Sequence, residues 1–385
     1  MVTLLLIIIY IAFISLGLPD SMLGAAWPAI RADLSLPMAG AGLISMIVSG
    51  GTIVSSMFSG KVINRLGTAK VVVISVFMTA MALFGFALSK NYVWLCIMGL
   101  PLGLGGGSID AALNNFVALH YSARQMSWLH CFWGLGATVG PIIMSACIFK
   151  YGLWQKGYLT VAIIQSCLVI ILLFSFPLWK TFRDNEDKDA EIQNNNQNVF
   201  KLPGITPALL SFFFYCAVEA TAGLWGASYL VNIKGVSADV AAGWVSIYYF
   251  GITIGRLING FVTSKLSNTA LIRGGQIIIG LGTLLLLIFN QIYIGLIGLI
   301  FLGIGCAPIF PSMLHETPAR FGKKNSSRLM GLQMAFAYMG TTFVPPILGL
   351  LSGVTGIQIY PLFILVLLIL MFVSNENTNR AVKAT

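Results

Sequence analysis

Charged side chains are scarce in this sequence. Only 9% of its 385 residues are Asp, Glu, Lys or Arg, whereas 57% are hydrophobic. Soluble globular domains carry about 25% charged residues, so this composition excludes an ordinary soluble protein. Apolar stretches recur along the whole chain instead, which predicts an integral membrane protein.

Motifs for nucleotide binding, hydrolysis and zinc binding are also missing. The chain contains no P-loop lysine, no Gly-x-Ser-x-Gly elbow and no Cys-x-x-Cys pair among its six cysteines. Gly103-Leu-Gly-Gly-Gly-Ser108 lacks the third spaced glycine of a dinucleotide fingerprint, and His315-Glu-Thr-Pro-Ala319 lacks the second histidine of a zinc protease. ATP-driven transport is therefore not supported, an intramembrane enzyme is a remote alternative, and neither a cofactor nor a metal site is expected.

Long hydrophobic runs predict twelve transmembrane helices, and hence an all-α membrane protein. A run of about 20 residues crosses a hydrocarbon core about 30 Å thick at a rise of 1.5 Å per residue. The predicted spans are 4–27, 38–60, 69–88, 92–118, 126–149, 156–178, 205–232, 238–264, 270–288, 292–316, 326–350 and 355–374.

Basic residues are unevenly distributed among the connections between these spans. The net charge is +10, and most Lys and Arg residues fall in the even-numbered connections and in the C-terminal tail. The positive-inside rule then places both termini in the cytoplasm of a multi-pass protein of the inner or plasma membrane. We expect the protein to lie in a lipid bilayer and to have no nucleic-acid partner.

One connection, 180–203, is rich in charged residues, Asn and Gln. Such a segment cannot bury a core, so it predicts a cytoplasmic linker. It separates a six-helix bundle at 1–179 from a second bundle at 204–385, which ends in a short cytoplasmic tail.

The two halves are related by a shift of 200 residues. This shift aligns residues 60–66 with 260–266 and residues 103–105 with 303–305. Two similar halves joined by a cytoplasmic loop predict a parallel repeat about an axis along the membrane normal, with substrate between the halves. We therefore expect a monomeric carrier whose halves rock to give alternating access.

The segment Gly60-Lys-Val-Ile-Asn-Arg-Leu-Gly67, followed by Lys70, resembles the loop signature of the major facilitator superfamily. The usual Asp of that signature is Asn64 here. The resemblance implies two pseudo-symmetric six-helix bundles and secondary active transport. It also implies a conformational loop formed by Gly60, Asn64, Arg65, Gly67 and Lys70.

Three further segments resemble the fucose:proton symporter group of that superfamily. Asp20 matches a first-helix Asp, and Asp110-Ala-Ala-Leu-Asn114 resembles a fourth-helix Glu-Thr-Ala-Ala-Asn. Residues 129–137 resemble a fifth-helix Ala-Gln-Ser-Phe-Asn-Ser-Leu-Gly-Ala, with His130 and Trp133 in place of Gln and Asn. The resemblance implies proton-coupled uptake but does not carry over the identity of the sugar.

One helix face in the fourth span combines glycines with polar side chains. Gly99, Gly103, Gly107, Asp110 and Asn114 fall within an arc of about 80°. A carboxylate at the centre of a span costs about 2.5 to 3.5 kcal/mol, which favours a functional Asp110 that lines a cavity. The alternative is that the glycines only permit close packing and Asp110 hydrogen-bonds a neighbouring helix.

Three carboxyl groups lie deep in predicted spans, namely Asp20, Asp110 and Glu219. Such groups can load and release protons as a cavity opens to either side, so we predict that they couple transport to protons, with sodium as the competing ion. Alternatively, Asp20 could satisfy the backbone groups that Pro19 leaves without a hydrogen-bond partner, and Glu219 could be a permanently neutral packing residue. Arg256 either snorkels toward the cytoplasm or neutralises a carboxylate.

The polar and aromatic residues of the spans suit a neutral hydroxylated solute. Sugar hydroxyls need paired donors and acceptors and an aromatic ring to stack on. We predict a monosaccharide bound by Asp110, Asn114, Asn115, His130, Trp133, Trp225, Tyr248 and Gln333. The main alternative is a drug or metabolite:proton efflux antiporter, because residues 136–141 resemble the core of the fifth-helix motif of drug:proton antiporters.

Overall fold

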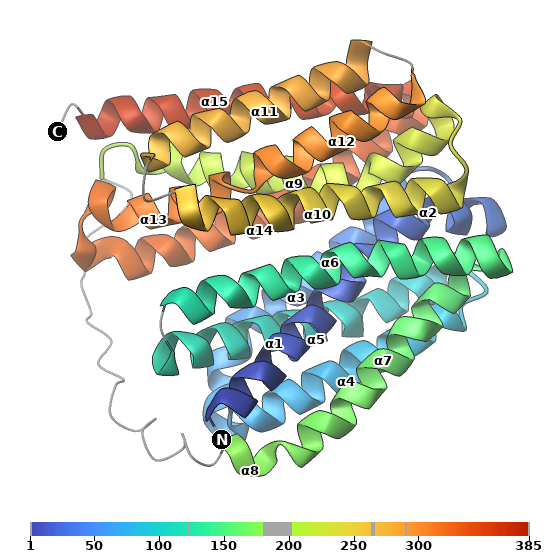
Figure 1. The fold of residues 1–385 in the computed structure, drawn as a ribbon, viewed down its shortest axis with the longest axis horizontal. Coiled ribbons are helices and arrows are strands. Elements are labelled where there is room, and N and C mark those ends of the chain that lie inside the picture. Colours follow the sequence, from blue (N-terminus) through green and yellow to red (C-terminus); the bar gives the residue numbers. More distant parts are fainter. Residues whose placement is uncertain (1, 122, 180–201, 263–265, 289–290, 384–385) are drawn as a thin grey trace. The chain divides into compact units, whose positions relative to one another are not determined.

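The computed structural model describes residues 2–121, 123–179, 202–262, 266–288 and 291–383 (Figure 1). Every regular element in these ranges is helical, because a chain in hydrocarbon must satisfy its backbone hydrogen bonds within each segment. The elements are α1 (Val2–Asp20), α2 (Met22–Asp33), α3 (Gly40–Leu66), α4 (Thr68–Ala87), α5 (Tyr92–His120), α6 (Ala123–Tyr151), α7 (Trp154–Phe174), α8 (Phe176–Trp179), α9 (Ile205–Lys234), α10 (Ala238–Val262), α11 (Asn268–Ile288), α12 (Ile292–Cys306), α13 (Ile309–Phe321), α14 (Lys323–Thr355), the 3-10 helix η3 (Ile357–Ile359) and α15 (Tyr360–Lys383).

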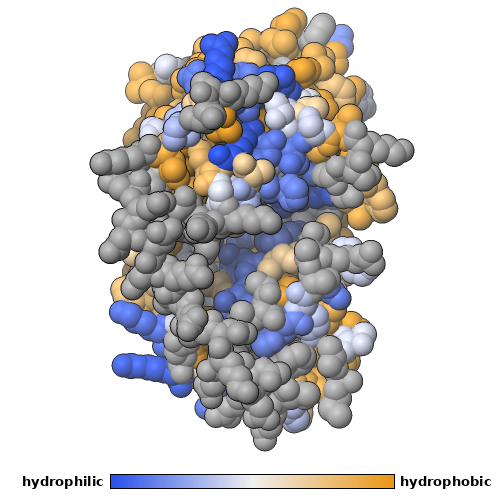
Figure 2. Space-filling view, turned by 90° about the vertical axis from the view of Figure 1, so that its left-hand side faces the viewer, coloured by the Kyte–Doolittle hydropathy of each residue, from blue (hydrophilic) through white to orange (hydrophobic). Residues whose placement is uncertain are grey.

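Twelve helical segments among the described residues are long and apolar enough to cross a membrane, which confirms the predicted number. The first segment, Thr3–Asp33, and the tenth, Ile292–Phe321, extend beyond their predicted ends. Both contain a break, between α1 and α2 and between α12 and α13. Large hydrophobic side chains are exposed on the surface, where Figure 2 shows them in orange, as contact with lipid requires.

The described chain divides into two compact units. Unit 1 comprises Met1–Ile192 and Ala238–Ser246, and unit 2 comprises Gln193–Ser237 and Ile247–Thr385, so helix α10 is divided between them. Residues 180–201, which make up most of the predicted linker, lie outside the described residues. In unit 1, α1 packs on α6 and α4 on α5; in unit 2, α9 packs on α14 and α11 on α12. These pairs correspond under the 200-residue shift.

Close approaches between helix backbones repeat with the same shift. Gly103 of α5 lies against the backbone carbonyl of Val48 in α3, and Gly303 of α12 lies against that of Tyr248 in α10. A side chain at either glycine would collide with the facing carbonyl. Glycine therefore allows these helices to touch, and the internal repeat seen in the sequence is also a repeat of packing.

Gly103→Ala and Gly303→Ala are each expected to destabilise the protein by about 1 to 3 kcal/mol, because the added methyl group forces two packed helices apart. Thermal unfolding of the purified protein in detergent measures this loss. Gly50→Ala is the matched control on α3, since an added carbon meets nothing within 4 Å there. Equal melting temperatures for the three variants would contradict the packing argument.

Candidate functional site

The break between α1 and α2 is stabilised by a side chain from another helix. Pro19 has no backbone N–H, so the carbonyl of Ser15, four residues earlier, lacks its helical donor. Gln165 of α7 donates its Nε2 to that carbonyl at 2.8 Å, and its Oε1 accepts the Thr79 hydroxyl of α4 at 2.7 Å. Gln165 thus satisfies the freed backbone, and the Asp20 carboxylate has a different partner.

That partner is Trp133 of α6, whose indole Nε1 donates to Oδ2 of Asp20 at 2.8 Å. The two helices approach closely because Gly17 lies against the Trp133 carbonyl and Gly136 lies against the Ile14 carbonyl. The Asp20 side chain is exposed and Trp133 is half-buried, so both keep surface that a solute can contact.

Helix α5 adds a second carboxylate to this group. Nδ2 of Asn114 donates to Oδ1 of Asp110 at 2.8 Å, across one helical turn. The carboxylates of Asp110 and Asp20 lie close enough for their negative charges to repel each other. Unit 1 thus brings together Asp20, Asp110, Asn114 and Trp133 from three places in its chain, and we call these four residues the carboxylate site.

The glycine face of α5 serves packing. Gly103 and Gly107 lie directly against α3, and the Thr52 hydroxyl of α3 donates to the Gly103 carbonyl at 3.2 Å. The glycines therefore have the role that the sequence analysis gave as the alternative, which is close helix packing. Asp110 and Asn114 continue the same face and keep exposed surface.

Two other predicted binding residues of unit 1 lie beside members of the carboxylate site in sequence. His130 is one helical turn before Trp133 on α6; its side chain is exposed, and its ring meets the Phe13 ring edge-on, with centroids 5.9 Å apart. Asn115 follows Asn114 on α5 and is exposed. Their roles in binding remain predictions.

Unit 2 contains a largely buried ion pair. Nη2 of Arg256 on α10 lies 3.3 Å from Oε1 of Glu219 on α9, and their side chains are 16% and 18% exposed. Of the two roles that the sequence left open for Arg256, the structure supports neutralisation of a carboxylate. Tyr248 of α10 also holds α9 at this residue, because its hydroxyl donates to the Glu219 backbone carbonyl at 2.9 Å.

Three predicted substrate residues are at most 1% exposed within unit 2, namely Trp225, Tyr248 and Gln333. Nε1 of Trp225 donates to the Pro345 carbonyl at 2.8 Å, and Oε1 of Gln333 accepts the Thr317 hydroxyl at 3.0 Å. In this structure all three pack the interior and offer no surface to a solute.

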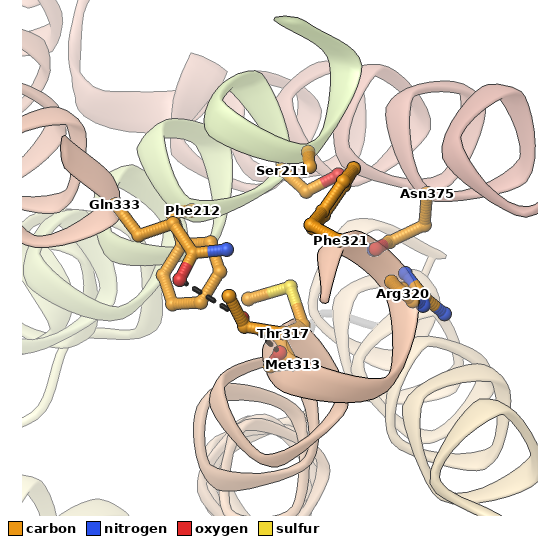
Figure 3. A pocket seen from close by; sticks show the side chains of 9 residues that line it. Ser211, Phe212, Met313, Thr317, Arg320, Phe321, Gln333 and Asn375 are labelled. Atoms are coloured by element: carbon orange, nitrogen blue, oxygen red, sulfur yellow. Dashed lines mark hydrogen bonds between the residues drawn. The ribbon is translucent and has the colours of Figure 1, made fainter. Parts of the chain in front are cut away.

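Gln333 also borders a small cavity lined by residues of α9, α13, α14 and α15. Figure 3 shows Gln333 and Thr317 on one side of it and Arg320 and Asn375 on the other. Its volume is about 10 Å³, which is room for one water molecule and far too little for a sugar. This cavity is therefore not a solute site.

The predicted conformational loop is the turn between α3 and α4. Gly60 lies near the end of α3, and Gly67 links the two helices with a φ of 79°, which glycine adopts readily. Arg65 and Lys70 flank this turn with exposed side chains. The side chain of Asn64 lies outside the described residues.

The described residues hold no cluster suited to a metal. No three His, Cys, Asp or Glu side chains in these ranges come close enough to bind an ion together.

Comparison with known proteins gives one family match and several distant relatives. The family model described as Major Facilitator Superfamily matches residues 9–237 and 207–379. The cis,cis-muconate transport protein of Acinetobacter baylyi is 23% identical over 275 residues, which are 67% of this chain and 65% of that protein. The glucose/mannose transporter of Bacillus subtilis is 25% identical over 255 residues, which are 60% of this chain and 59% of that protein.

Both relatives are thus matched over less than two thirds of their own length. Among solved structures, the crystal structure of a D-xylose-proton symporter has a TM-score of 0.75 to this chain. The match covers 96% of each chain at 13% identity, which shows a shared fold.

Proposed function

Since the chain belongs to the major facilitator superfamily, we propose that it is a proton-coupled carrier that takes up a small neutral hydroxylated solute by alternating access. The family and the shared fold make it a multi-pass membrane transporter and not an enzyme. We propose a monosaccharide as the solute and the proton as the coupling ion, with sodium as the ion to test against it.

The observation that carries the proposal is the carboxylate site. A membrane span penalises a carboxylate charge, and a second carboxylate nearby adds repulsion, so binding one proton relieves both costs. Asp20 and Asp110 stand in this relation, and Trp133 hydrogen-bonds Asp20. A proton gained or lost here changes what the indole and the neighbouring carboxamide of Asn114 can bind, which links protons to solute.

The chemistry of the site favours a neutral solute. Carboxylate, carboxamide and indole groups supply the acceptors, donors and ring face that sugar hydroxyls and a pyranose face require. In unit 2 the positive charge of Arg256 is already balanced by Glu219, so it provides no spare cation for an anion. The glucose/mannose transporter among the relatives agrees with a sugar.

A second candidate is a carboxylated metabolite, carried either inward or in exchange for protons. It is favoured by the relative named as a cis,cis-muconate transport protein. Such a substrate could gain a counterion by displacing Glu219 from Arg256.

The orientation and assembly of the carrier complete the proposal. The placement of basic residues supports cytoplasmic termini in an inner or plasma membrane. We further propose that the monomer is the working unit and that no cofactor takes part.

Protein reconstituted into liposomes is expected to accumulate a labelled monosaccharide when the exterior is made acidic, and to lose this accumulation when a protonophore dissipates the gradient. D-glucose, D-mannose, D-xylose and muconate serve as parallel probes. Accumulation driven by a sodium gradient alone would replace the proton with sodium. Accumulation of muconate without any of the sugars would establish the second candidate in place of the first.

A further inference from the structure

Three cations lie at the turn between α3 and α4, and no carboxylate among the described residues pairs with them. Lys61 and Arg65 on α3 and Lys70 on α4 are exposed, and within the described ranges none of them forms a salt bridge. The sequence explains this, because the chain contains no Asp or Glu between Asp33 and Asp110.

Apart from Asp239 at the start of α10, the carboxylates of unit 1 that the structure describes are engaged elsewhere. Asp20 accepts the Trp133 indole, Asp110 accepts the Asn114 amide, and Asp33 accepts the Trp154 indole at 2.9 Å. Lys61 and Arg65 also lie one helical turn apart, where like charges repel. The described part of unit 1 therefore presents an uncompensated positive cluster, which we call the α3–α4 cation cluster.

This cluster lies at the edge of a lipid-facing surface. The apolar spans Gly40–Ile63 and Thr68–Ala87 end and begin beside it. Phe58 and Leu66 are 52% and 42% exposed, and Nζ of Lys61 lies 5.8 Å from the centroid of the Phe58 ring. A long cationic side chain over an apolar, exposed ring is the arrangement by which residues at a membrane boundary reach the headgroup layer.

We propose that Lys61, Arg65 and Lys70 bind the phosphate of an anionic phospholipid, whose acyl chains lie along the exposed face of Phe58 and Leu66. The ligand supplies both parts that the surface lacks, an anion for the cations and hydrocarbon for the apolar face. In the orientation proposed above, the cluster faces the cytoplasmic leaflet, where anionic lipids attract basic segments. At the typical contribution of a basic residue, three of them give about a 100-fold preference over a zwitterionic lipid.

The test compares three additives on the purified full-length chain in detergent. Short-chain phosphatidylglycerol is expected to raise the melting temperature, whereas phosphatidylcholine and inorganic phosphate at equal concentration are not. The triple variant K61Q/R65Q/K70Q is expected to weaken the apparent affinity for phosphatidylglycerol about 100-fold. High salt should weaken the wild-type response, because exposed charges are screened.

The matched control is the triple variant K90Q/K150Q/K156Q, which removes the same charge from three exposed lysines elsewhere in unit 1. It should keep the wild-type response, and native mass spectrometry should count retained phosphatidylglycerol in the control but not in K61Q/R65Q/K70Q. The same loss in both triple variants would reduce the effect to total charge and overturn the site. A full response to inorganic phosphate alone would overturn the lipid as its ligand.

Discussion

Asp20→Asn is expected to abolish proton-driven accumulation, so that the labelled solute only equilibrates across the liposome membrane. An amide cannot carry the coupled proton, yet its oxygen can still accept the Trp133 indole hydrogen that the carboxylate accepts at 2.8 Å. The solute site is therefore preserved while the coupling is removed. Exchange of labelled for unlabelled solute, which needs no net proton movement, should continue, and both rates are measured in the same vesicles.

Asp33→Asn is the matched control for this prediction. Asp33 also accepts a tryptophan indole, that of Trp154, but it lies at the end of α2 and is not part of the carboxylate site. Its variant should accumulate solute as the wild type does. Accumulation that survives in Asp20→Asn but is lost in Asp110→Asn would move the coupling group to α5, and survival in both would remove the carboxylate site from the mechanism.

The fold follows from hydrophobic length and repeats, but the ends of the helices depend on contacts distant in sequence. The predicted first span stops at residue 27, because Arg31 and Asp33 read as the start of a loop. The helix continues to Asp33 since Nε of Arg31 donates to the Leu36 carbonyl and Asp33 accepts the Trp154 indole. The hydrogen-bond partner of Asp33 is 121 positions away in the sequence, so the pattern of residues around the helix end could not predict it.

The carboxylate site shows the same limit. The bond between Asp110 and Asn114 follows from helical spacing, so it could be anticipated. The bond between Asp20 and Trp133 joins residues 113 positions apart and depends on how closely α1 and α6 pack. Gln165 was missed, although a glutamine inside an apolar run is itself a signal that some buried backbone group needs a partner.

Breaking the ion pair between Arg256 and Glu219 is expected to have the largest effect on stability. Either Glu219→Gln or Arg256→Met alone removes one charge of this pair and leaves the other in the membrane interior, and removing one partner of a buried pair typically costs about 3 to 5 kcal/mol. Both side chains are less than a fifth exposed, so water replaces the lost partner poorly. At about 2 to 4 °C per kcal/mol for a unit of this size, a loss of 3 kcal/mol lowers the melting temperature by about 6 to 12 °C.

The double variant Glu219→Gln/Arg256→Met should recover most of this loss, because two neutral side chains of similar length avoid the desolvation of two charges. The four proteins form a double-mutant cycle, in which recovery measures the coupling between the two residues. Glu376→Gln is the matched control: its partner Arg273 is half exposed, and water screens such a pair, so its loss should change the melting temperature little. Additive losses in the double variant would mean that the two charges do not stabilise each other. Glu219 could then no longer be regarded as the counterion that makes Arg256 unavailable to an anionic solute.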